Sequence, residues 1–500
     1  VRDRQRGLLL RVRAMGARRA WFRIRLGAGL LACGTGVAWA AGPDVLQVLD
    51  AYAPRQAQVA QALWRQPELG YLEERSSRLL QQELREAGFR IETGVAGMPT
   101  AFVASSGTRG SGPVIALLAE MDALPGMAQA AEPVRLPIDG QDAGQACGHN
   151  LFGAASVGAA RAVAQWLQAT GTPGEVRLYG TPAEEGGSGK VYLARAGLFD
   201  DVDVVLHWHP AAENSAAQGT SLANISGKFR FHGLAAHAAI APERGRSALD
   251  AVEAFNHMAN LMREHVPDGT RIHYVISNGG SAPNVVPDFA EAYYYVRHVD
   301  PAVVREVFAR LRRAADGAAL GTGTTVEFEQ TGGVFSLLPN DTLGQVMQVA
   351  LEQVGGVRYD AREQAFAQTL QQSLERRPPL DAAMQLQPYR ADVAGSASTD
   401  VGDVSWNVPT AGLGTATWVP GTPAHSWQAV AASGASVGAK GALNAAKALA
   451  LAAVRLFQSP DIVGKARDEF GQRRGADFRY VPLLQRDAPP LDYRRRPSAQ

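Results

Sequence analysis

Residues 113–126 read PVIALLAEMDALPG, and their continuous apolar run is typical of a strand buried on both faces of a parallel sheet. The runs EVRLYG (175–180) and VDVVLHWH (202–209) repeat this character. Between the first two runs, the small-residue stretch 151–171 predicts a helix that ends at Gly171. Because strands alternate with helices, we expect an α/β fold whose parallel strands are joined by right-handed crossovers.

Side chains that can bind metal stand at the ends of these strands. Asp122 follows the run ALLAEM, Glu184 and Glu185 follow VRLYG, and His209 ends VVLHW. In parallel sheets, sites form where the carboxyl ends of the strands meet. A metal-dependent hydrolase needs nitrogen, oxygen or sulfur ligands from several segments, together with one free carboxylate that takes a proton from water. The strand ends therefore predict such a centre.

In residues 224–333 the order of strand-like and helix-like segments changes, and we expect these residues to form a separate domain inserted into the first. Strand-like and helix-like segments occur there in the order β-α-β-β-α-β, which is the order of the ferredoxin-like α+β unit. The first domain would consist of residues 41–223 and 334–470, with its last long helix at 441–457. The Arg- and Pro-rich composition of residues 471–500 predicts an irregular tail.

Residues 1–40 predict a secretory signal peptide. Nine Arg and one Asp among residues 1–25 precede the apolar run LGAGLLACGTGVAWA, whose A-x-A ending predicts cleavage after Ala40. The mature protein would then be periplasmic or secreted. The segment RRAWFR loosely resembles a twin-arginine signal, and a lipoprotein anchored at Cys33 is a weaker alternative.

Removal of the signal changes the charge balance of the chain. Lys and Arg fall from 49 to 40 and Asp and Glu from 48 to 47, so the net charge changes from +1 to −7. The basic character is therefore no evidence for a nucleic-acid partner. No later stretch approaches the run of about 20 apolar residues that a membrane span needs. Cys147 becomes the only cysteine, which excludes an intramolecular disulfide.

The segment Cys147-Gly148-His149 places a sulfur and an imidazole in one turn, where both can face one ion. Asn150 would then cap the following helix. A buried cysteine beside a capping turn explains the same residues without a metal, because cysteine is commonly buried for packing. The segment alone does not decide between these readings.

The other motifs also have two readings each. Glu184 and Glu185 can divide the work between a metal ligand and a general base, or they can form a solvated acidic turn. His207 and His209 project to the same face of an extended segment, as ligand and neighbour or as core histidines. His425 lies in the turn-rich stretch GTPAHSW, where it could be an ordinary loop histidine. Only the other segments favour its interpretation as a metal ligand.

Together the motifs resemble those of the di-metal aminoacylase and carboxypeptidase amidohydrolases, and among these the B-subunit-like members of the aminobenzoyl-glutamate hydrolase branch. The resemblance covers about residues 58–458. It implies a phosphorylase/hydrolase-like catalytic domain, with a mixed sheet sandwiched by helices, and a lid domain that dimerises. The matching segments are EMDALPG, GHN after Cys147, YGTPAEEGGSGK, FDDVD followed by WHP, GLAAHAA, GRSALDAVE, APNVVPD, ASTDVGDVSW and GTPAHSWQ.

The resemblance also implies roles for the residues of the catalytic domain. Cys147 would bridge two divalent ions, either Zn or Mn, and Glu184 would be the general base. Asp122 would orient a ligand. Asp400 matches a motif aspartate of uncertain role. The remaining ligands would be His149, Glu185, His209 and His425.

Three residues of the lid match functional positions of the family. His237 would reach the active site of a partner chain and stabilise the oxyanion there. Asn284 and Arg297 would hold a carboxylate of the substrate. These roles imply a homodimer through the lid domain, or a heteromer with a related chain.

Two departures from the family bear on the substrate and the metal. Asn150 and Phe152 replace the Asp and the further His of hippurate-type members, which favours the aminobenzoyl-glutamate branch. Glu120 and Asp122 stand where carboxypeptidase-type members have HxD, so the metal would have to rely on Cys147 and later histidines.

The expected activity is metal-dependent hydrolysis of the amide bond of an N-acyl or N-aminobenzoyl amino acid, with an aminobenzoyl-glutamate-like compound as the preferred substrate. Three alternatives remain at this point. The chain could be a dipeptidase of the same fold, a non-catalytic periplasmic binding protein, or an obligate subunit that needs a related partner chain.

Overall fold

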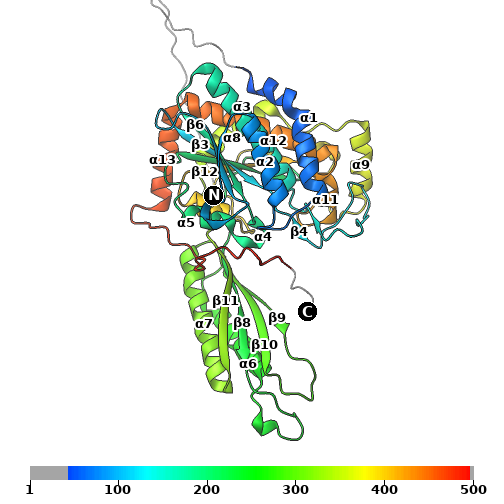
Figure 1. The fold of residues 1–500 in the computed structure, drawn as a ribbon, viewed down its shortest axis with the longest axis vertical. Helices are drawn as coiled ribbons and strands as arrows, with labels where there is room; N and C mark the ends of the chain where they lie inside the picture. The colour runs from blue at the N-terminus through cyan, green and yellow to red at the C-terminus, as the bar shows by residue number, and fades with distance from the viewer. Residues whose placement is uncertain (1–42, 496–500) are drawn as a thin grey trace, which may run out of the picture. The chain divides into compact units, whose positions relative to one another are not determined.

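The computed structural model describes residues 43–495, so the predicted signal peptide lies outside the described part of the chain. A six-stranded sheet has the strand order β1-β2-β6-β3-β7-β12 (Figure 1). Its strands are β1 (Arg90–Thr93), β2 (Phe102–Gly107), β3 (Val114–Glu120), β6 (Glu175–Thr181), β7 (Val204–Ala211) and β12 (Thr410–Ala416).

This sheet is mixed. Strands β6, β3, β7 and β12 are parallel neighbours, whereas β2 runs antiparallel to both β6 and β1. Every residue of β3 and β6 is buried, which explains why their sequences are apolar on both faces. The predicted α/β fold built on a mixed sheet is therefore confirmed.

Long helices pack on this sheet. Helix α3 (His149–Thr170) lies against β3, β6 and β7, and α12 (Ser436–Gln458) packs beside it against β7 and β12. By length and composition α12 is apolar enough to cross a membrane, but it is largely buried against neighbouring helices, as a core helix is. The other helices of this region are α1 (Val45–Arg65), α2 (Glu74–Glu86), α4 (Glu184–Gly187), α5 (Gly189–Arg195), α8 (Asp341–Val354), α9 (Ala361–Gln371), α10 (Val401–Ser405), α11 (Trp427–Ser433) and α13 (Pro460–Arg474).

Two predictions about helices are wrong, one about the start of α3 and one about which long helix comes last. Asn150 does not cap α3, because the helix already begins at His149, after Gly148. The Asn150 amide instead donates to the carbonyls of Ala60 and Ser433, both at 3.1 Å, and so joins distant segments. The helix at 441–457 is not the last long one either.

A further helix, α13, begins at Pro460 and ends at Arg474. Proline suits the first helical position because its fixed φ fits the helix and its missing N–H would be unpaired there in any case. Gly475, at φ 85°, follows the last helical residue. The tail without regular secondary structure thus begins at Gly475 instead of residue 471.

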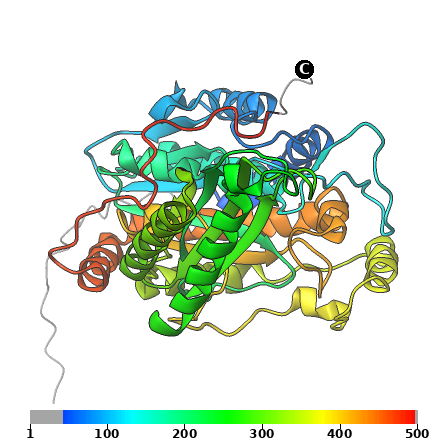
Figure 2. The ribbon, with the colours of Figure 1, turned by 90° about the horizontal axis from the view of Figure 1, so that it is seen from below.

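Residues 223–334 form a second sheet with the order β11-β8-β10-β9, in which all neighbouring strands are antiparallel. Helices α6 and α7 lie side by side on it (Figure 2). The sheet and its helices have a core of their own, which includes Phe229, Phe255 and Tyr294. In chain order the elements are β8 (Ala223–His232), α6 (Ala248–Met262), β9 (Arg271–Asn278), β10 (Phe289–His298), α7 (Pro301–Thr322) and β11 (Thr325–Val334), which is the expected β-α-β-β-α-β order.

Candidate metal centre and active site

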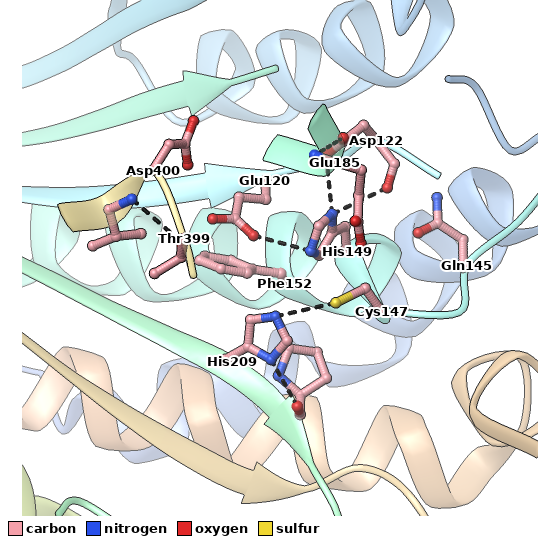
Figure 3. A network of polar contacts seen from close by, with 12 residues as sticks. Glu120, Asp122, Gln145, Cys147, His149, Phe152, Glu185, His209, Thr399 and Asp400 are labelled. Carbon is pink, nitrogen blue, oxygen red and sulfur yellow. Dashed lines mark hydrogen bonds and ion pairs between the residues drawn. The ribbon is translucent and has the colours of Figure 1, made fainter. Parts of the chain in front are cut away.

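The side chains that were predicted as metal ligands lie together near the carboxyl ends of β6 and β7. Figure 3 shows four of them: Cys147, His149, Glu185 and His209. The predicted ligands make two groups of three that share one sulfur atom. Within each group the ligand atoms all lie within 4.8 Å of one another. Because Cys147 belongs to both groups, its Sγ lies close to the ligand atoms of each. The groups are Cys147, His149 and His209, and Cys147, Glu185 and His425.

His149 is held by the chain on both sides of it. Gly148 has φ 76°, and a Cβ atom there would lie 2.9 Å from the ring of Pro210, so glycine fits this turn best. His149 Nδ1 lies 3.0 Å from Asp122 Oδ1. The other carboxylate oxygen of Asp122 accepts from the backbone N–H of Glu185 at 2.8 Å. Asp122 therefore orients one residue of each ligand group, as expected for a residue that positions ligands.

Glu184 and Glu185 form the short helix α4 (Glu184–Gly187), whose backbone is strained. Ala183 and Ser188, on either side, have φ 58° and 57°, which residues with a Cβ rarely adopt. Two buried contacts hold this turn: Ala183 N–H donates to Glu73 Oε1 at 2.8 Å, and the Tyr71 hydroxyl donates to the Gly187 carbonyl at 2.7 Å.

His425 also has a left-handed backbone, with φ 57°. Its N–H donates to the Ala146 carbonyl at 3.0 Å, next to Cys147. Its Nε2 lies 3.1 Å from Glu185 Oε1. The residue is thus fixed beside two other members of its group, although it stands more than 200 residues from both of them in the sequence.

The two adjacent glutamates differ in their electrostatics. Burial, followed by repulsion from Glu120 and Glu185, raises the pKa of Glu184 well above its usual range. Burial alone would also raise the pKa of Glu185, but the contact with His425 and the attraction of His149 outweigh it and lower that pKa. Neighbouring carboxyl groups whose pKa values are pushed apart are the pattern that separates a proton carrier from an ionised ligand.

A buried chain of charges adjoins the centre, and the sequence reading missed it. Lys190 Nζ lies 2.7 Å from Glu120 Oε1 and 2.7 Å from Asp400 Oδ1, and the Lys190 N–H donates to Asp400 Oδ2 at 2.9 Å. All three residues are at most 2% exposed. Asp400, to which the sequence assigned no role, thus balances the charge of the buried Lys190 ammonium group.

Glu120 also reaches the ligand cluster directly. Its Oε2 lies 3.0 Å from His149 Nε2 (Figure 3), and Glu120, His149 and Glu184 form a third group able to hold a cation. The expectation that this segment contributes no ligand does not fit this geometry. A signal was present in the sequence, because Glu120 is the one charged residue of the buried strand β3.

Three buried atoms test whether a metal suits this cluster. Glu120 Oε2, His149 Nε2 and Glu185 Oε1 have no hydrogen-bond partner, although each lies close to another ligand atom. Buried donor atoms of this kind that converge on one another without hydrogen-bond partners suit a bound cation. Burial raises the pKa of the Cys147 thiol, so a thiolate there needs a nearby positive charge. The mixed sulfur, nitrogen and oxygen donors fit a divalent transition metal.

The three candidate residues of the second sheet do not join this cluster. His237 bridges to Val285, and its Nδ1 accepts from Ala239 and Ile240 N–H, so it lies next to Asn284 in exposed loops before β10. Arg297 lies near the other end of β10, where Nη1 is 3.4 Å from Ser398 Oγ. At about 3.3 Å per strand residue, roughly 25 Å separate the two ends.

His207 lies outside the groups of possible ligands found in residues 43–495. Its ring packs against β12, where a Cβ atom at Gly412 would lie 2.4 Å from it. Burial lowers the pKa of His207 to about 4, so the ring is neutral at physiological pH. Of the two histidines on β7, only His209 contacts Cys147, with 3.4 Å between Nε2 and Sγ.

Parallel strand ends that carry this ligand set beside a further carboxylate, Glu184, are typical of a metal-dependent hydrolase. The chain belongs to Peptidase family M20/M25/M40, whose model matches residues 116–412, and it is an enzyme of that family.

Two relatives and one solved structure are similar to the chain. The chain is 39% identical to the B-subunit of p-aminobenzoyl-glutamate hydrolase from Escherichia coli (strain K12), over 87% of this chain and 96% of that protein. It is 31% identical to the Xaa-Arg dipeptidase of Mus musculus, over 84% and 90%. Its fold resembles that of a dinuclear metal binding peptidase from Bacillus subtilis, with a TM-score of 0.57, 20% identity, and coverage of 82% and 99%.

Proposed function

We propose that this enzyme hydrolyses the amide bond of an N-aminobenzoyl or N-acyl amino acid, with an aminobenzoyl-glutamate-like compound as its substrate. The observation that carries the proposal is the pair of ligand groups that share Cys147 beside Glu184. The 39% identity to one chain of a p-aminobenzoyl-glutamate hydrolase, over nearly that protein's whole length, supports this choice of substrate.

The donor atoms suit two divalent cations, either Zn or Mn. One would be held by Cys147, His149 and His209, and the other by Cys147, Glu185 and His425. When bound, such cations polarise the amide carbonyl and acidify water. The unpartnered Oε2 atom supports adding Glu120 as a further oxygen donor on the His149 side.

Glu184 supplies the proton chemistry in this proposal. Its carboxylate takes the proton from the attacking water and delivers it to the leaving nitrogen when the amide bond breaks. Burial raises its pKa, which makes the carboxyl group a stronger base than an exposed glutamate. Glu185 cannot do the same work, because its Oε1 is committed to the ligand group of His425.

The second sheet would act as a lid and as the dimer interface. Strand β9 is an edge of that sheet, and it exposes Val275 and Ile276, while Leu261 is exposed on α6. Apolar side chains on an open strand edge favour pairing with another chain. In a homodimer, His237 and Asn284 would complete the active site of the partner subunit. Arg297 would contribute to the active site of its own chain.

A heteromer with a related chain is the alternative to the homodimer. The relative from Escherichia coli is named as one subunit of a hydrolase, and a second subunit of that hydrolase is 27% identical to this chain, over 62% of this chain and 82% of that subunit. Size measurement of the purified protein, alone and after expression with a related chain, distinguishes the two assemblies. A dimer formed by this chain alone would favour the homodimer, and a monomer that associates only with the related chain would favour the heteromer.

We also propose that the mature protein begins at Ala41 and works in the periplasm or outside the cell. The basic and apolar order of residues 1–40 supports this location. Small acyl-amino acids that reach the periplasm would then be accessible to the enzyme. Cell fractionation with a C-terminally tagged chain tests the location, and a full-length protein in the cytoplasm would refute it.

A dipeptidase is the second candidate function, because the chain is also 31% identical to an Xaa-Arg dipeptidase. The test is a panel of p-aminobenzoyl-glutamate, N-acyl glutamates and Xaa-Arg dipeptides, given to metal-loaded mature protein. The proposal predicts the highest kcat/KM for the aminobenzoyl or acyl compounds. A dipeptide that is cleaved more than about tenfold better than all of them would establish the second function instead.

A further inference from the structure

We propose that the C-terminal segment is a working part of the active site. Residues 476–495, named here the strap, would position the turn that carries Glu184 and Glu185, with Tyr493 and Arg494 as the positioning residues. This inference rests on the proposed function, because it takes Glu185 as a metal ligand and Glu184 as the general base. Neither residue of the strap touches the reacting atoms.

The strap ends on the catalytic turn. Arg494 Nη2 donates to the backbone carbonyl of Glu185 at 2.6 Å, and the Tyr493 hydroxyl donates to the same carbonyl at 3.1 Å. A carbonyl with two donors, one of them charged, is held in position and direction. The carbonyl belongs to the residue that follows the proposed base, so its placement governs both carboxylates.

The strap also packs behind the turn. The Tyr493 ring meets the Tyr71 ring edge-on, with 5.7 Å between centroids, and Tyr71 donates to the Gly187 carbonyl. A Cβ atom at Gly70 would lie 2.4 Å from the Tyr493 hydroxyl, so the chain leaves room for this contact. Two aromatic residues that pack against each other therefore hold the turn. Tyr493 bonds to the Glu185 carbonyl, and Tyr71 bonds to the Gly187 carbonyl.

The turn needs such support because its backbone is unfavourable. Ala183 and Ser188 stand at positive φ, and Glu185 itself departs from helical geometry at ψ 65°. A left-handed backbone is unfavourable for residues with a Cβ, such as Ala183 and Ser188, and it persists only when the surroundings over-determine it. Apart from the strap, hydrogen bonds from other segments act on the N–H groups of Ala183 and Glu185 and on the Gly187 carbonyl. The Glu185 carbonyl depends on the strap.

The strap is anchored along its length, although it has no regular secondary structure. Near its start, Arg305 of α7 donates to the Val481 carbonyl at 2.8 Å, and Gln330 of β11 donates to the Leu483 carbonyl at 2.9 Å. Leu483 and Leu484 are almost fully buried. Residues of the second sheet and its helices thus fix the strap before it reaches the turn.

Helix α5 holds the middle of the strap. Arg195 donates to the Arg486 carbonyl at 2.6 Å, and the Tyr192 hydroxyl donates to the Ala488 carbonyl at 3.3 Å. Figure 1 shows the strap, coloured red, passing α5 and ending near α4. The same continuous segment therefore touches α7, β11, α5 and the catalytic turn. A segment fixed at so many points can hold a turn that a free tail could not.

The test compares Tyr493→Phe, Arg494→Ala and the double variant with the parent enzyme. Arg495→Ala is the matched control, because Arg495 is an exposed neighbour with the same charge. Each protein is metal-loaded, and kcat, KM, thermal stability and the rate of metal release to a chelator are measured. Arg494→Lys is included because it restores a charged donor without the guanidinium shape.

We expect the double variant to lower kcat by about tenfold or more while KM changes less than about twofold, since small displacements of catalytic groups are costly. One of the two cations should be released faster, because Glu185 is a ligand of only one group. Arg494→Lys should recover part of kcat. Parental kcat and parental release of both cations in the double variant would overturn the inference, and so would a loss of thermal stability alone.

The chelator measurement separates this inference from the proposed function. If the parent cleaves no compound of the panel, the proposed substrate class fails. Faster loss of one cation in the double variant, with Arg495→Ala unchanged, would still support the strap. Equal release from all variants would refute the strap, whatever the substrate proves to be.

Discussion

The metal centre and the loops around His237 differ in how far one chain completes them. At the centre, ligands from distant segments converge, and their positions are fixed by buried contacts with Asp122, Tyr71 and Lys190. His237 and Asn284, in contrast, lie in two exposed loops that contact each other. The difference teaches that the candidate metal ligands all come from one chain, whereas the proposed complete active site requires a second one.

The largest effect should come from Glu184→Gln, which removes the proposed base. General-base catalysis contributes about 10²–10⁴-fold, so kcat should fall by that order. Metal content should stay at the parental level, because Glu185 still supplies its ligand atom. Glu92→Gln, at an exposed site, is the control. Turnover of the Glu184 variant at the parental rate would remove Glu184 from the mechanism.

His237→Ala tests the second region of this comparison, the exposed loops around His237. Loss of one oxyanion donor costs about 10²–10³-fold in kcat, and metal content should not change because no ligand is touched. Mixed dimers of His237→Ala with Glu184→Gln should regain activity, because one of their two sites has both an intact base and a partner's intact histidine. Mixed dimers as inactive as either variant alone would contradict donation across the interface.

Glu120→Gln tests the residue that the sequence reading set aside. The amide keeps the size of the side chain but removes the charge that faces His149 Nε2. Metal affinity should fall by about 10–100-fold, the size of effect seen when groups that support a metal ligand are changed. Competition with a chromophoric chelator measures this change, with Glu74→Gln as an exposed control. Unchanged affinity would show that Glu120 serves only Lys190.

The smallest expected effect concerns pH and lies away from the ligands. Burial raises the pKa of Asp403 to about 7, against 3.8 for the ordinary carboxyl group, and its oxygens accept from Tyr480 of the strap and from Phe335 N–H. Between these two pKa values the folded state holds a proton that the unfolded state has released. Stability from this group is therefore lost as pH rises through the folded pKa.

Asp403→Asn removes that loss. Its free energy of unfolding should therefore improve relative to the parent when pH is raised through this window, by up to about 1.4 kcal/mol for each pH unit. Urea denaturation at several pH values measures it, and the exposed Asp461→Asn serves as control. A parallel pH dependence of the parent and Asp403→Asn would show that Asp403 is ionised throughout.

Much of this arrangement was predictable because the chemistry follows strand ends. Apolar runs located β3, β6 and β7, and the rule that sites form at carboxyl ends then selected Asp122, Glu185 and His209. The sequence reading also separated the second sheet by its change in rhythm. These signals are local, since each depends on a few consecutive residues.

The parts that were missed depend on contacts between distant residues. Lys190 pairs with Glu120 and Asp400, which are far from it in the sequence. No local sequence pattern around Lys190 indicates that its side chain is buried. The strap has neither apolar periodicity nor a motif, so its composition indicated only an irregular tail. Asn150 was predicted to cap the following helix, yet that helix begins one residue earlier, at His149.

Metal counting on the purified mature enzyme tests the central claim most directly. Elemental analysis of the parent and of Cys147→Ala gives the number of divalent ions per chain. We predict two ions in the parent and at most one in the variant, because the sulfur belongs to both ligand groups. A metal-free parent, or a variant that keeps both ions, would contradict the shared-sulfur centre.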